Sequence, residues 1–236
     1  MIKKWHWYVG FFLLLFTGYF LYFFSHEDFS QSSLPVINNN VQPFSFINQD
    51  GRNITEKDVD GKVYVTEYFF TTCKGICPKM NANMRRVYDT YKVDSSFMII
   101  SHTCMPETDS VPLLKKYEQK MLDGKLVKKA DGSYKIDYDS TVGAKQTALN
   151  SSWNFVTGDK QDLYKMARQS YMIDNNKPDT AANIADQFIH TQFFALVDKQ
   201  CRVRGIYDGL KEDEIQKLLK DIDELLKEKY QSRSLN

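Results

Sequence analysis

The sequence has little net charge, few cysteines and no internal repeat, and each of these absences excludes a class of protein. Its 31 Lys and Arg residues are balanced by 30 Asp and Glu residues, interspersed along the chain. This balance gives no electrostatic reason to expect nucleic-acid binding. Four cysteines are too few for a disulfide scaffold, and a core of this size needs no such bridges. The cysteines that lie close together are therefore expected to serve chemistry.

The N-terminal region lacks both a small-x-small cleavage site and a nearby cysteine. Residues 1–4 are basic, and residues 5–24 carry no formal charge. A helix of this length spans a hydrocarbon core of roughly 30 Å. The apolar stretch also exceeds the usual core of a cleaved signal peptide, which is the alternative interpretation. We therefore expect an uncleaved transmembrane helix without a lipid-modified cysteine, and export of everything after it.

Composition divides the remainder into a linker, one domain and a tail. Residues 25–40 are polar and are expected to form the linker, and residues 231–236 the tail. Residues 41–230 have the size of one globular domain. The transmembrane anchor at 5–24, preceded by the basic N-terminus at 1–4, completes this division.

Apolar segments and turn signals predict alternating strands and helices in the domain. Strands are expected at 44–47, 63–70, 96–101, 152–157, 188–198 and 203–207, and helices at 78–91, 109–121, 161–170 and 211–230. Residues 122–146 have no clear period and are interpreted as a surface hairpin or insertion. This order predicts a thioredoxin-like α/β fold, in which a central mixed sheet carries helices on both faces.

Two cysteines lie at the first long strand-to-helix turn. Cys73 and Cys77 follow the strand expected at 63–70, and Pro78 suits the first turn of a helix. The nearby helix N-terminus favours the thiolate form. A spacer of three residues, rather than the two typical of thiol–disulfide oxidoreductases, lets both sulfurs face one ion. Thiolate sulfur selects Cu(I), with zinc and iron–sulfur clusters as competitors. A structural disulfide or two buried thiols remain the alternative.

Two sulfurs require at least one more ligand, and several residues are candidates. Of the four histidines, only His102 and His190 belong to the expected domain, and a lone histidine at a strand start is more often a surface residue. Cys104 and Met105 follow His102 at the expected sheet edge; they either fill a pocket beside the site or act as accessory ligands. Cys201, in an expected hairpin turn, is interpreted as a bystander thiol.

These motifs resemble the Sco/SenC family, the copper chaperones of cytochrome c oxidase assembly. The most specific stretch is Phe69-Phe70-Thr71-x-Cys73-x3-Cys77-Pro78, preceded by Phe44-x-Phe46 and Gly61-Lys62-Val63. The resemblance implies that His190 is the third ligand, so that Cys73, Cys77 and His190 bind one copper ion as Cu(I) or Cu(II). It also implies delivery to the binuclear copper centre of cytochrome c oxidase subunit II or a similar copper-site protein. The domain would face the periplasm from the bacterial inner membrane, or the intermembrane space from the mitochondrial one.

Three features depart from the family pattern. The cysteine loop carries Lys74 and Gly75 where the family commonly has Pro and an acidic residue, and Met105 replaces the first aspartate of an Asp-Pro-x-x-Asp loop that ends here at Asp109. The segment 122–146 is longer than the family norm.

Other functions use the same residues differently. A thiol–disulfide oxidoreductase needs the cysteine pair but not His190. A peroxidase-like thiol enzyme needs one low-pKa cysteine, and a zinc site would use the same three ligands.

Overall fold

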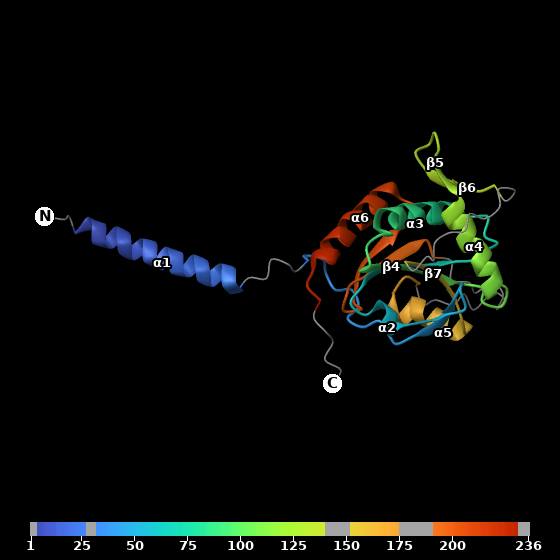
Figure 1. Ribbon diagram of the computed structural model, residues 1–236, viewed down its shortest axis with the longest axis horizontal. Coiled ribbons are helices and arrows are strands. Elements are labelled where there is room, and N and C mark those ends of the chain that lie inside the picture. The colour runs from blue at the N-terminus through green and yellow to red at the C-terminus, as the bar shows by residue number, and fades with distance from the viewer. Residues whose placement is uncertain (1–3, 27–31, 140–151, 175–190, 231–236) are drawn as a thin grey trace.

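A computed structural model describes residues 4–26, 32–139, 152–174 and 191–230 (Figure 1). Its first helix, α1 (Trp5–His26), contains a 19-residue apolar stretch, Trp5–Phe23, of which nothing is buried inside the protein. By length and composition this helix is able to cross a membrane, as the sequence predicts. The division of the chain into linker, domain and tail stays a prediction.

A seven-stranded mixed sheet forms the centre of the domain, in the order β2-β1-β7-β4-β3-β8-β9. The strands are β1 (Ser45–Asn48), β2 (Asn53–Thr55), β3 (Val63–Phe69), β4 (Phe97–Thr103), β7 (Trp153–Thr157), β8 (Phe193–Val197) and β9 (Val203–Asp208). Strands β3, β4 and β7 run parallel, whereas β8 is antiparallel to β3, and β1 to β7. The predicted thioredoxin-like arrangement is confirmed.

Helices cover both faces of this sheet (Figure 1). We call one side the α3 face, which carries α3 (Cys77–Tyr91), α4 (Val111–Asp123) and α6 (Glu212–Lys227), and the other the α5 face, which carries α2 (Glu56–Val59) and α5 (Lys160–Lys165) with its π-helical continuation η1 (Met166–Ser170). Because side chains alternate along a strand, Phe69 of β3 packs with Met80 on the α3 face, while Tyr68 packs with Leu163 on the α5 face. Every residue of β3 and β4 is buried, which explains their nearly continuous apolar sequences.

Several element boundaries differ from the sequence-based expectation. Strand β8 begins at Phe193, because the Thr191 hydroxyl accepts the Phe193 amide hydrogen just before the ladder; residues 188–190 lie outside the described part of the chain. Helix α6 ends at Lys227, where Glu228 turns to an extended backbone and pairs with the buried Arg204 at 3.2 Å. The short elements β2 and α2 were not predicted.

The segment expected as a surface insertion contains a separate hairpin. Strands β5 (Lys125–Lys128) and β6 (Tyr134–Asp137) pair with each other in a two-stranded sheet, and β6 lies against α3. Residues 140–146 of the same segment lie outside the described residues. The described part confirms a hairpin at this position.

Candidate metal centre

Cys73 and Cys77 lie where β3 ends and α3 begins. The Cys73 amide donates to the Phe70 carbonyl at 3.2 Å, which closes a turn, and Cys77 is the first residue of α3. Both thiols are free, and Cys73 lies close enough to Cys77 to affect the pKa of its thiol. Cys77 is buried, whereas Cys73 is only half-buried. The fold therefore brings two sulfurs together and leaves one of them open to a partner.

The environment of Cys77 differs from the sequence-based expectation of a thiolate. Burial raises the pKa of the Cys77 thiol well above its usual range, and the neighbouring Cys73 thiol raises it further. Burial thus outweighs the effect of the helix N-terminus on this residue. A metal ion bound here would have to displace a proton from Cys77.

Asp109, to which the sequence analysis assigned no role, holds the cysteine turn in place. Its carboxylate accepts hydrogen bonds from the Thr71 amide at 3.2 Å, the Thr71 hydroxyl at 2.6 Å and the Thr103 hydroxyl at 2.5 Å. These bonds join the residue two positions before Cys73 to the end of β4. Since Asp109 is 1% exposed, water cannot replace it as the acceptor.

We expect Asp109→Ala to destabilise the metal-free protein by about 2–4 kcal/mol, because one buried and two partly buried donors lose a charged acceptor. Copper affinity is expected to fall about 10- to 100-fold, the usual effect of removing a group that orients a ligand. Chemical denaturation and competition with a Cu(I) chelator measure the two effects. Asp109→Asn is the matched variant, since its amide oxygen still accepts from Thr71. Equal copper affinity in Asp109→Ala and the wild type would contradict the assigned role.

His102 lies on the opposite side of the sheet from Cys77. Its ring is fully buried on the α5 face, stacked on Tyr68 at a centroid distance of 4.9 Å, with Nδ1 3.0 Å from the Thr66 hydroxyl. Burial lowers the pKa of His102 to about 3, so the ring is neutral at physiological pH. Its Nε2 has no hydrogen-bond partner among the described residues. The structure does not bring His102 to the two sulfurs.

Cys104 and Met105 also belong to the α5 face. Cys104 is buried in the apolar cluster on that side, and Met105 packs against the same cluster. Burial raises the pKa of Cys104 beyond its usual range. Cys201 is buried in the turn between β8 and β9 and is a free thiol as well. Whether Cys104 or Met105 contacts a bound metal stays a prediction.

His190 lies outside the described residues, so its position relative to the sulfurs stays a prediction. The neighbouring strand nevertheless has an informative direction. Strand β8 is antiparallel to β3, with Ala195 opposite Thr66. The first residues of β8 therefore lie at the sheet edge where β3 ends, which is the edge that carries the cysteine turn.

Glu67 is a buried carboxyl group that the sequence analysis did not single out. Its Oε1 accepts from the Ser101 hydroxyl at 2.8 Å, which in turn accepts from the Trp153 indole at 2.9 Å; Oε2 has no partner among the described residues. Burial raises the pKa of Glu67 to about 8, against the opposing effect of the Ser101 hydrogen bond. An acidic residue inside the apolar run Tyr64–Phe70 was the available signal.

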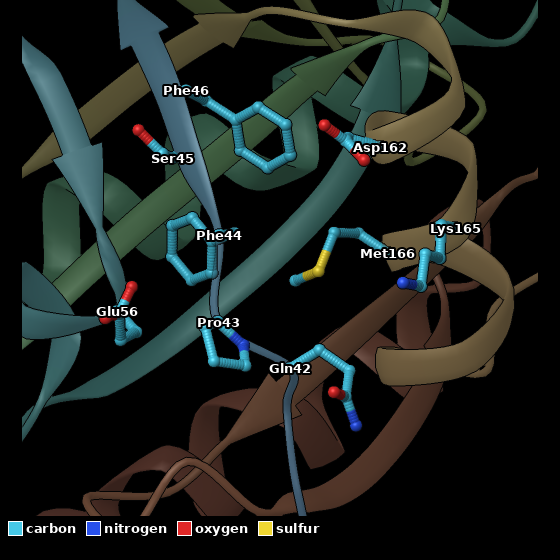
Figure 2. A pocket seen from close by; sticks show the side chains of 9 residues that line it. All are labelled: Gln42, Pro43, Phe44, Ser45, Phe46, Glu56, Asp162, Lys165 and Met166. Carbon is cyan, nitrogen blue, oxygen red and sulfur yellow. The ribbon is translucent and has the colours of Figure 1, made fainter.

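A hollow of about 380 Å³ lies on the α5 face (Figure 2). Phe44, Phe46 and Met166 point into it, and the charged side chains of Asp162 and Lys165 lie on its α5 side. Neither Cys73 nor Cys77, nor any other predicted ligand that the structure describes, lines it. The sheet separates this hollow from Cys77, so it is not part of the candidate metal centre.

Comparison with known proteins gives a consistent result. The SCO1/SenC family model matches residues 36–133 and 134–227. The SCO1 protein homolog of Bacillus subtilis is 28% identical over 188 residues, covering 79% of this chain and 82% of that protein.

Two solved structures share the fold. BsSco, described as a member of the Sco family of cytochrome c oxidase assembly proteins with a disulfide switch, superposes with a TM-score of 0.57 at 26% identity, covering 82% of this chain and 96% of that one. Copper-bound ScoI of Arabidopsis thaliana superposes with a TM-score of 0.52 at 20% identity, covering 78% and 97% of the two chains. Because the family model spans most of the sequence, the chain belongs to the SCO1/SenC family.

Proposed function

We propose that this protein binds one copper ion through Cys73, Cys77 and His190 and passes it to the binuclear copper site of cytochrome c oxidase subunit II. The observation that carries the proposal is the pair of free, neighbouring thiols at the end of β3, one of them accessible. Soft sulfur ligands select Cu(I) over harder ions. A half-buried Cys73 gives an acceptor a route to the metal without unfolding of the domain.

Two further observations support this proposal. The start of β8 lies at the sheet edge that carries the cysteines, which favours a third ligand from the residue just before Thr191. Copper-bound ScoI of Arabidopsis has the same fold. Helix α1 would hold the domain at the membrane, close to a membrane-bound oxidase.

A second candidate function is reduction of a disulfide in the copper-accepting protein. It is favoured by the proximity of the thiols of Cys73 and Cys77 and by the disulfide switch described for BsSco. In this reaction the two thiols would become one disulfide, and their two electrons and two protons would reduce the partner's disulfide to two thiols. Such exchange needs no imidazole ligand.

Replacing His190 with alanine separates the two functions. We expect His190→Ala to lower copper affinity at least about 10-fold, because it removes one of three direct ligands, and to leave disulfide reduction unchanged. Competition with a copper chelator and an assay with a model disulfide measure the two activities on the full chain. His26→Ala is a matched control outside the proposed site. Unchanged copper affinity together with rapid disulfide reduction would favour the reductase and contradict the chaperone.

A further inference from the structure

A small cavity opens beside Cys73, between α4 and the β5–β6 hairpin. It has a volume of about 70 Å³ and is lined by Thr71, Cys73, Pro78, Tyr117, Lys120, Met121, Lys135 and Ile136. Helix α4 supplies Tyr117, Lys120 and Met121, and strand β6 supplies Lys135 and Ile136. Any group that approaches Cys73 through this opening therefore passes the hairpin.

Several interactions hold the hairpin in position. The Arg85 guanidinium donates to the carbonyls of Met121, Leu122 and Gly124 at the base of the hairpin. Arg86 lies over the Tyr134 ring at 4.3 Å and forms a bidentate ion pair with Glu212, both distances being 2.6 Å. The hairpin is thus a fixed side of the opening.

Side chains around the opening are mainly basic. Among the described residues, Lys120 forms no ion pair, and Lys135 pairs only with the exposed Asp137, at 3.6 Å. An exposed pair at this distance contributes little. Lys74 and Lys79, exposed on either side of Cys77 in the sequence, add two further positive charges, of which Lys79 lies near the hairpin residue Asp131.

We propose that the rim formed by Lys120, Lys135 and Ile136 is a docking surface for an acidic segment of the protein that accepts the copper. The carboxylates of that segment would pair with the two lysines, and its apolar side chains would contact Ile136. The surface brings the acceptor's ligands to Cys73, the only half-buried cysteine of the four. This inference rests on the proposed function and specifies the chemistry of its partner.

The double variant Lys120→Glu/Lys135→Glu tests the rim in the full chain, held in lipid nanodiscs. Copper transfer to the copper-free soluble domain of oxidase subunit II, followed by stopped-flow absorbance, is expected to slow about tenfold at low ionic strength, because reversed rim charges mainly change the association rate. At about 0.5 M salt the difference should disappear through screening. The matched control Lys57→Glu/Lys220→Glu, on α2 and α6, is expected to transfer copper at the wild-type rate.

A second measurement is independent of copper. Exchange of Cys73 with a dianionic aromatic disulfide (dithiobisnitrobenzoate) is expected to slow about tenfold in the rim variant, while exchange with uncharged dithiodipyridine stays unchanged. Equal rates for the rim variant and the wild type, in transfer and in exchange, would overturn the inference. So would transfer at the wild-type rate combined with lost binding to phosphatidylglycerol vesicles, which would assign the lysines to a membrane surface. If the wild type binds no copper, the proposed function fails. The exchange measurement still tests whether the rim lysines attract an anionic partner to Cys73.

Discussion

Replacing Cys77 with serine is expected to lower Cu(I) affinity by more than about a hundredfold while the fold survives. Loss of a group that merely orients a ligand costs up to about a hundredfold, and loss of a soft ligand itself should cost more. Serine has nearly the shape of cysteine, and Cys77 is followed by Pro78 and a helix that the substitution leaves intact. A buried hydroxyl should cost about 1–3 kcal/mol of stability. Anaerobic competition with a Cu(I) chelator and thermal denaturation measure the two effects.

The other cysteines provide matched controls for this result. Cys201, buried in the β8–β9 turn, packs on the α5 face, so Cys201→Ser should keep the wild-type affinity. Cys104→Ser decides whether the thiol in the neighbouring loop contributes to binding. An unchanged affinity in this variant supports the pocket-filling interpretation, and a loss comparable to that of Cys77→Ser makes Cys104 a ligand. Retention of copper by Cys77→Ser would show that the thiol pair is not the copper site.

The sequence predicted the thiol pair's position because local patterns determine it. An apolar run ending at Phe70, a short turn and Pro78 are enough to place Cys73 and Cys77 between a strand and a helix. The protonation state of Cys77 was not predictable in this way. It depends on burial, to which residues far along the chain contribute, such as Tyr117 of α4.

Other features were missed for different physical reasons. The side of the sheet that His102 faces follows only from the strand's register, which also separates it from Cys77. The short helix α2 had a readable signal, a capping box between Thr55 and Asp58, but four residues give no apolar periodicity. The buried acceptor roles of Asp109 and Glu67 depend on partners from neighbouring strands and could not be derived from spacing.

Replacing Glu67 with glutamine is expected to make the stability of the metal-free, reduced protein less sensitive to alkaline pH. In the unfolded chain this carboxyl loses its proton near pH 4.5, whereas in the folded protein burial raises the pKa of Glu67 to about 8. Between these pH values the folded state holds one more proton than the unfolded chain. The unfolding equilibrium constant of the wild type therefore rises about tenfold per pH unit. Glutamine carries no such proton. Relative to the wild type, the free energy of unfolding of Glu67→Gln should therefore rise by about 4 kcal/mol between pH 4.5 and 8. This corresponds to a change on the order of a thousandfold in the unfolding equilibrium constant.

The contribution of His102 to the free energy of unfolding depends on pH in the opposite direction, which gives the predicted pH–stability curve a distinctive shape. Its pKa is lowered from 6.5 to about 3 in the fold, so the unfolded chain binds a proton first and stability falls as pH drops from 6.5 to 3. In the wild type the two effects oppose each other between about pH 4.5 and 6.5 and should leave a plateau. In Glu67→Gln only the histidine effect remains, so stability should rise throughout that interval.

Denaturant titrations at successive pH values measure both curves. Glu107→Gln, at an exposed residue bonded to Lys160 at 2.9 Å, is the control and should change stability little above pH 5. A difference between Glu67→Gln and the wild type that stays constant from pH 5 to 8.5 would mean that Glu67 is already ionised in the folded protein. The sheet would then have to hold a buried charge beside the thiol pair, and the neutral carboxyl assigned to this position would be wrong.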